Sequence, residues 1–139
     1  SINLPNNIPG IKPLAISSDG NTIVIGGYMS ENIIFQKAAG IWSIEQKLPF
    51  RGISVAISAD GNTIASSDPF DSTHPLGVTR VWTRINGLWS HKSLLYDNTV
   101  YPGEYIQNFD IDLIASGGIL FVSNYDLTET PVPRIRIFR

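Results

Sequence analysis

The sequence contains no cysteine among its 139 residues and only one methionine. Disulfide bonds, thiolate metal ligands and cysteine nucleophiles are therefore excluded. Charged residues are also scarce, at 16%, and the 10 Lys and Arg nearly balance the 12 Asp and Glu. A net charge of −2 provides no long-range attraction to nucleic acid or to an anionic membrane. No apolar run approaches the ~20 residues that a membrane-spanning helix needs.

Sequence signatures of catalysis are missing as well. There is no Gly-x-Ser-x-Gly turn, no His-Glu-x-x-His pattern and no phosphate-binding loop. His74 and His91 stand in different segments without neighbouring metal ligands, so both are expected at the surface. We therefore predict that the protein is not an enzyme. The alternative would require carboxylates that converge from distant strands onto one axis.

The chain does contain an internal repeat. Residues 14–23 match residues 55–64 almost one for one, and both copies carry Ser-x-Asp-Gly-Asn-Thr-Ile. A Gly-x-Trp-Ser segment follows in each copy, at 40–43 and again at 87–90. A third, degenerate copy is indicated by residues 115–120 and by Arg-Ile-Phe near the C-terminus. Such self-similarity is typical of repeat architectures.

Each repeat contains four short apolar runs and no helical stripe. Asp-Gly corners join the first two runs, because Asp tolerates left-handed backbone and Gly adopts positive φ without steric cost. In the fourth run Trp42, Ile44 and Leu48 are expected on one face of a strand. Four antiparallel strands per unit of roughly 40 to 50 residues correspond to a propeller blade. We predict an all-β, β-propeller-like fold made of three four-stranded antiparallel blades.

The predicted blades cover residues 14–48, 53–95 and 109–139 of a single domain, residues 1–139, with residues 1–4 as a candidate closing strand. Three blades are few, because propellers typically carry four to eight. An open ring exposes strand edges that pair readily with other chains. We therefore expect a partial propeller that is completed by self-association or within a larger assembly. The chain opens on Ser1 rather than Met, and we expect a processed protein or a segment of a longer one.

Residues 52–65, 77–84 and 87–89 carry a resemblance to the FG-GAP-type β-propeller repeats of integrin α-chain heads and bacterial surface proteins. The resemblance implies a propeller fold and a surface-exposed setting, such as a cell-surface or virion component. Arg51 stands where the family has Phe before Gly52. The Asp-x-Asp-x-Asp-Gly calcium loop of the integrin members is absent, so no cofactor is predicted.

The most polar loop, residues 68–74, contains Asp68, Asp71 and His74. Its oxygen atoms could hold Ca²⁺, but their spacing is irregular and a solvated loop is the plainer interpretation. Asp19 and Asp60 have equivalent positions in the repeats, where a hairpin corner explains them.

Aromatic residues recur at matched positions of the repeats, which are Phe35, Trp42, Trp82, Trp89 and Phe138. We interpret them as wedges between adjacent blades, because large aromatic side chains dominate sheet packing. The alternative is that Trp42 and Trp89 stack on a glycan. The predicted third strand of the second and third repeats is rich in arginine. We interpret these arginines as charges that discourage edge pairing, and they are Arg80, Arg84, Arg134, Arg136 and Arg139.

These patterns predict a non-enzymatic protein-interaction or structural assembly module, and a glycan-binding propeller lectin is the alternative. The expected partners are proteins, with carbohydrate as the alternative, and neither nucleic acid nor membrane insertion is expected. The binding surface would comprise the loops at residues 26–32, 68–77 and 124–133 and the aromatic insertion at 96–105. The candidate binding residues are Tyr28, Asp68, Phe70, Asp71, His74, Tyr96, Tyr101, Tyr105 and Tyr125.

Overall fold

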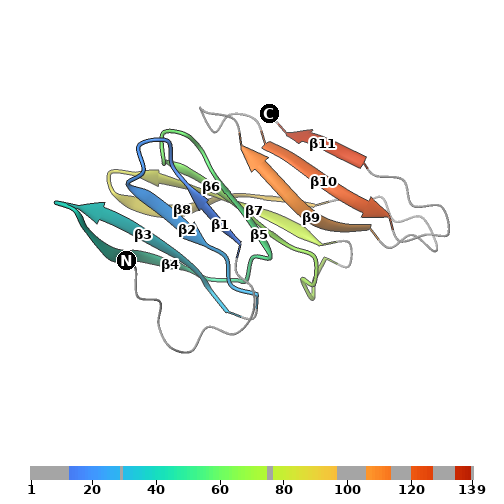
Figure 1. The fold of residues 1–139 in the computed structure, drawn as a ribbon. Coiled ribbons are helices and arrows are strands. Elements are labelled where there is room, and N and C mark those ends of the chain that lie inside the picture. The colour runs from blue at the N-terminus through green and yellow to red at the C-terminus, as the bar shows by residue number, and fades with distance from the viewer. Residues whose placement is uncertain are drawn as a thin grey trace.

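The computed structural model describes residues 13–28, 30–74 and 77–96, and the backbone of three later strands at 106–113, 120–126 and 134–138. Every regular element among them is a β-strand, which confirms the predicted all-β class. The strands form three antiparallel sheets (Figure 1). No helix that could span a membrane occurs in this part of the chain.

The first sheet contains, in spatial order, β1 (Leu14–Ile16), β2 (Thr22–Ile25), β3 (Asn32–Ala38) and β4 (Ile41–Leu48). The second repeats this order with β5 (Ser54–Ile57), β6 (Thr63–Asp68), β7 (Val78–Ile85) and β8 (Leu88–Leu95). The third has the order β11 (Arg134–Phe138), β10 (Leu120–Asp126) and β9 (Ile106–Leu113). We call these sheets the first, second and third blades.

The prediction of three four-stranded blades is thus correct for two blades. Within the described residues the third blade has three strands, because no fourth strand follows β11. The candidate closing strand at residues 1–4 lies outside the described residues.

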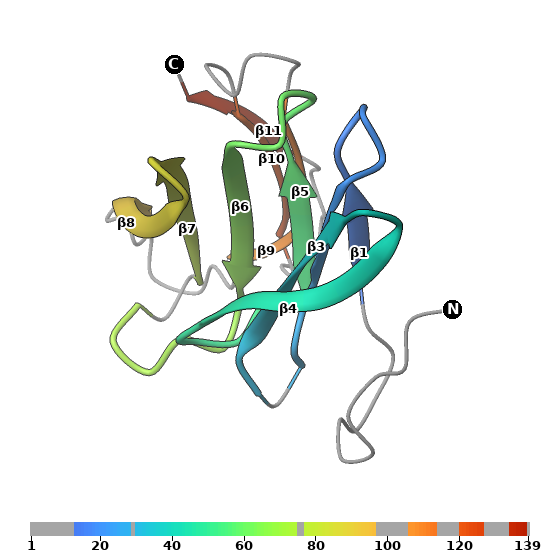
Figure 2. The same ribbon diagram turned by 90° about the vertical axis from the view of Figure 1, so that its left-hand side faces the viewer.

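The blades lie side by side through their first strands. β1 contacts β5, and β5 and β6 contact β9, whereas β4 and β8 lie at the far edges of their sheets (Figure 2). This arrangement places each sheet against the next in the manner of neighbouring propeller blades.

The repeated Asp residues form the predicted turns. The Ser17 hydroxyl donates to Asp19 Oδ1 over 2.6 Å, and the Asn21 amide donates to the same oxygen over 3.0 Å. Ser58 and Asp60 make the equivalent bond over 2.5 Å. These bonds hold the pKa of both carboxyls below the usual range. Asp19 and Asp60 are therefore accounted for as turn residues.

The hydrophobic core lies between the first and second blades. The first blade contributes Val24, Ile34 and Leu48, and the second contributes a larger set, Val55, Ile57, Ile64, Trp82 and Trp89. Each of the two tryptophans is 5% exposed. The packing interpretation of Trp82 and Trp89 is confirmed. Phe35 and Trp42 belong to a separate cluster on the other face of the first blade.

The alternation predicted for the fourth run is wrong beyond Ile44. Ile34 pairs with Gln46 and Phe35 pairs with Ile44, so Glu45 is an extra residue in a β-bulge. The bulge reverses the faces of the strand, and Leu48 consequently enters the interblade core while Trp42 remains on the opposite face. Glu45 and Gln46 both reach toward the second blade as a result.

Candidate functional site

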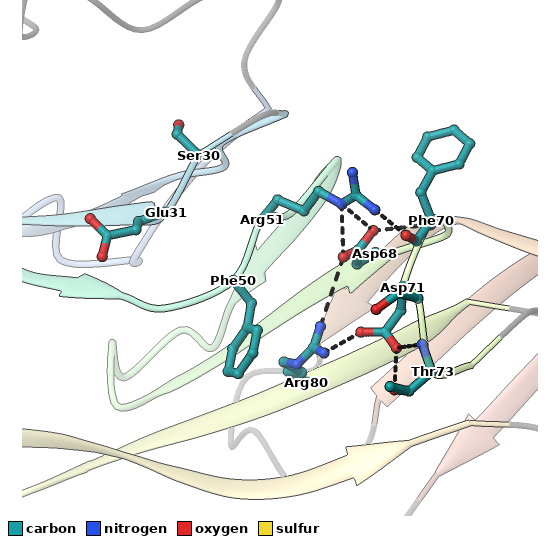
Figure 3. A pocket seen from close by; sticks show the side chains of 10 residues that line it. Ser30, Glu31, Phe50, Arg51, Asp68, Phe70, Asp71, Thr73 and Arg80 are labelled. Atoms are coloured by element: carbon teal, nitrogen blue, oxygen red, sulfur yellow. Dashed lines mark hydrogen bonds and ion pairs between the residues drawn. The ribbon is translucent and has the colours of Figure 1, made fainter.

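Three connections meet at one end of the interface between the first and second blades. They are the β2–β3 loop, the β4–β5 connection and the β6–β7 loop, and they surround a cavity of about 520 Å³ (Figure 3). Its charged lining consists of Glu31, Arg51, Asp68, Asp71 and Arg80, and two phenylalanines, Phe50 and Phe70, complete its aromatic lining.

Arg51 is fixed by a buried carboxylate. Its Nε lies 2.8 and 2.9 Å from the two carboxylate oxygens of Asp68, and its Nη2 donates to the carbonyl oxygen of Phe70. Asp68 is 4% exposed and also accepts the Phe70 amide over 3.0 Å. These bonds join the β4–β5 connection to the β6–β7 loop, so the two walls of the cavity are held together.

Arg80 forms the second ion pair. Its Nη2 lies 2.5 Å from Asp71 Oδ2, and its Nη1 faces Asp68 at 4.0 Å. Burial raises the pKa of Asp71, but bonds from Thr73, Arg80 and His74 outweigh it and hold that pKa well below the usual range. Asp71 is therefore a permanent anion at neutral pH, and its charge is matched by Arg80.

Three aromatic side chains are exposed at this end: Tyr28 (45%), Phe50 (53%) and Phe70 (44%). Tyr28 meets Phe70 edge to face at 6.4 Å between ring centroids. A guanidinium lies over each phenylalanine, at 4.1 Å for Arg80 on Phe50 and 5.5 Å for Arg51 on Phe70. The rings are thus positioned by the arginines without being buried.

Phe50 also adopts an uncommon backbone conformation. Its φ is 80°, which lies in the left-handed region that large side chains rarely occupy. Such a conformation costs about 1–2 kcal/mol for a residue with a Cβ. Neither core packing nor backbone preference explains an exposed ring at this position, so Phe50 is a candidate for function.

The other end of the interface is closed by Arg84. Its Nη1 donates to Gln36 Oε1 over 2.9 Å and to Glu45 Oε1 over 3.0 Å, and both acceptors belong to the first blade. The Trp89 indole N–H donates to Glu45 over 3.1 Å. This end is cross-linked between blades and belongs to the structural part of the interface.

The structure brings together most of the predicted binding residues that it describes. Tyr28, Asp68, Phe70 and Asp71 lie around the cavity or at its rim. His74 bonds Asp71 over 2.9 Å, and its ring lies 4.4 Å from that of Tyr96, but neither residue is part of the cavity lining. Tyr101 and Tyr105 lie outside the described residues, and Tyr125 lies on β10, of which only the backbone is described.

The two tryptophans considered for glycan stacking differ in their surroundings. Trp89 is 5% exposed and lies in the interblade core, so it presents no open face to a sugar. Trp42 is partly buried, and the Lys37 ammonium lies 5.9 Å from its ring.

Sequence analysis does not single out Phe50 or Arg51 as site residues, and it includes Glu31 only as part of the predicted binding loop at residues 26–32. Residues 49–52 fall between the first two predicted blades, and the positive φ of Phe50 leaves no sequence signal. Arg80 was interpreted as a charge that discourages edge pairing, which is wrong. β7 is an inner strand between β6 and β8, and Arg80 is 7% exposed.

The carboxylates of the polar loop at residues 68–74 form ion pairs with arginines and are not arranged around a metal ion. Asp68 and Asp71 each bind a guanidinium. Among the described residues, no group of three or more His, Asp or Glu side chains gathers in a way that could hold a metal ion.

No protein-family model matches the sequence, and no curated protein matches it. Similar solved structures include the β-propeller domain of Myceliophteria thermophila Cps50 (Swd1), with a TM-score of 0.65 and 18% identity over 92% of this chain and 40% of that one. The tricorn protease is also similar, with a TM-score of 0.52 and 11% identity over 87% of this chain and 11% of that one. At these identities the similarity shows the fold alone, and it confirms a propeller-type arrangement. The chain spans about 40% of the Cps50 structure.

Proposed function

We propose that the protein is a non-enzymatic interaction module that binds a partner polypeptide at the cavity between its first two blades. The observation that carries this proposal is the exposed group of Tyr28, Phe50 and Phe70 on a base of ion-paired arginines. Aromatic and arginine side chains are the residue types that dominate binding energy at protein interfaces. The loops are held by one buried and one partly buried ion pair, so little conformational entropy is lost when a partner binds.

The state of the two carboxylates at the site, Asp68 and Asp71, supports binding rather than catalysis. Asp71 is held anionic by its bonds, and Asp68 and Asp71 are each occupied by an arginine. A general acid or base needs a pKa near the working pH and access to the substrate. Asp71 does not meet the first condition, and burial limits the second.

A displayed random-peptide library, selected on the folded 139-residue chain, tests the proposal. We expect selected peptides to bind the unmodified protein and to lose about tenfold or more in affinity for the Phe50→Gly/Phe70→Ser variant. Lys92→Ala, an exposed change on β8, is the control and should leave affinity unchanged. Failure to select any peptide that depends on these rings would overturn the proposal.

The finer family assignment is part of the same proposal. We assign the repeats to the FG-GAP type on the segments at 52–65, 77–84 and 87–89, and a cell-surface or virion setting rests on that resemblance alone.

The expected self-association or larger assembly also stays a prediction. Leu14 and Ile16 on β1 are 58% and 52% exposed, and Ile44 on β4 is 45% exposed. Burying these side chains against another sheet would be favourable. Sedimentation of the chain over a range of concentrations tests this, and a constant monomer mass would contradict self-association.

A further inference from the structure

The charges that line the cavity do not balance. Arg51 is matched by Asp68 and Arg80 by Asp71, both through short ion pairs. Glu31, from the β2–β3 loop, is the remaining charged residue of the lining. It is exposed, and it makes no ion pair or side-chain hydrogen bond with any described residue. The cavity therefore carries one surplus negative charge, located at its rim.

Arg80 does not offer a site for an anion, whereas the Arg51 side chain is 30% exposed. The carboxylates that occupy the two arginines are largely buried, with side-chain exposures of 6% for Asp68 and 10% for Asp71. The Arg80 Nη1 makes no hydrogen bond, but it is buried and faces Asp68 rather than the open cavity (Figure 3). An incoming anion would approach two fixed carboxylates and a third free one, which is unfavourable at close range.

The apolar part of the cavity complements a long side chain. Phe50 and Phe70 contribute exposed rings to the lining on either side of Arg51 and Asp68, and Glu31 joins the lining from the first blade (Figure 3). Lysine and arginine side chains combine an apolar stem with a cationic head, so the stem can cover aromatic surface while the head remains near a carboxylate. Arg80 and Arg51 already lie over one face of Phe50 and Phe70, so the apolar stem rather than the cationic head is the part that suits the rings.

From this arrangement we propose that the partner polypeptide anchors in the cavity through a lysine or arginine side chain, with its stem against Phe50 and Phe70 and its head at Glu31. This inference rests on the proposed function and specifies the chemistry of the partner. The positive anchor is selected by the one carboxylate of the cavity lining that an arginine does not already neutralise.

The test uses three small probes with the ¹⁵N-labelled chain: the N-acetyl amides of arginine, norleucine and glutamate. Each is titrated while amide chemical shifts are recorded. We expect shifts centred on the backbone around Gly52 and Phe70 and about fivefold tighter binding of the arginine probe than of norleucine, the effect of one partly exposed ion pair. The glutamate probe should bind more weakly than both.

Glu31→Gln supplies the second measurement. It should weaken the arginine probe about fivefold and leave norleucine unchanged, without altering stability, because Glu31 is exposed and unpaired with any described residue. Asp19→Asn removes the same charge from the β1–β2 turn, at the opposite end of the blade, and should affect neither probe. Equal affinities for arginine and norleucine, or preferred binding of glutamate, would overturn the inference.

The two proposals fail differently. Displayed peptides that need Phe50 and Phe70 but carry acidic or apolar anchors would overturn the cationic anchor and leave the interaction module standing. A displayed library that yields no ring-dependent binder would overturn the module itself, whatever the small probes show.

Discussion

Two arginines four residues apart on β7, Arg80 and Arg84, face the first blade from the same side of the strand. Arg80 lies at the open end of the interface, which holds the cavity, and Arg84 lies at the closed end, where the blades are cross-linked. Arg84 reaches across and bonds Gln36 and Glu45 of the first blade. Arg80 bonds Asp71 of its own blade and supports Phe50, which leaves the space in front of it open.

The difference shows how one repeated architecture separates stability from binding. Where polar groups cross between blades, as at Arg84, the gap is filled and the sheets are fixed. Where the arginines pair with nearby carboxylates of the second blade, as Arg51 does with Asp68 and Arg80 with Asp71, the ion pairs fix the base of the cavity and leave the aromatic rings exposed. Binding residues on a rigid scaffold are a common arrangement in proteins.

The largest effect is expected at the closed end. Trp89→Ala should lower the free energy of unfolding by about 3–5 kcal/mol, because it removes a buried aromatic side chain from the interblade core. Urea denaturation measures this. A glycan-stacking role would instead leave stability unchanged and remove sugar binding, so a small loss of stability would contradict the packing role.

Arg84→Ala should have the next largest effect. It leaves Glu45 without its cation between the blades, and we expect a loss of about 2–4 kcal/mol. A double-mutant cycle with Glu45→Ala should give a coupling free energy of about 1 kcal/mol or more. Lys92→Ala should change stability by less than about 0.5 kcal/mol and is the matched control. Additive effects of the Arg84 and Glu45 changes would mean that the blades are not joined there.

Sequence analysis found the repeated turns, the packing tryptophans and several residues of the cavity, but it found the polar contacts at neither end of the interface. The matched tryptophans and the Asp-Gly corners follow from repeat alignment, and the structure has Gly20 and Gly61 at φ of 68° and 70° in those corners. The ion pair of Arg80 with Asp71 depends on how the β6–β7 loop folds back along its hairpin, which periodicity does not reveal. The bulge at Glu45 is likewise a single-residue event that reverses a face without interrupting the apolar pattern.

At the open end, Asp71→Asn should cost about 1–2 kcal/mol at pH 7, because a charged partner of Arg80 is lost. The folded-state pKa of Asp71 lies below its unfolded value of about 3.9, so its contribution is complete above pH ~4 and is lost as the pH falls further. The stability difference between the two proteins should therefore persist from pH 7 to about 4 and narrow below that. Denaturation curves at several pH values check this, and a difference that grows on acidification would contradict it.

Phe50→Gly should have the smallest effect on stability. It relieves the left-handed backbone and loses the stacking contact with Arg80, and the two terms roughly cancel to within about 1 kcal/mol. The melting temperature measures the balance. A loss of more than about 2 kcal/mol would show that the ring serves the fold rather than a partner.

The most direct measurement compares the two ends in one assay: the dissociation constant of the best displayed peptide for Phe50→Gly/Phe70→Ser and for Arg84→Ala, at a temperature where both variants are folded. The separation of roles predicts a loss of about tenfold or more for the first variant and less than about twofold for the second. Equal losses in the two variants would show that the ends of the interface do not have different roles.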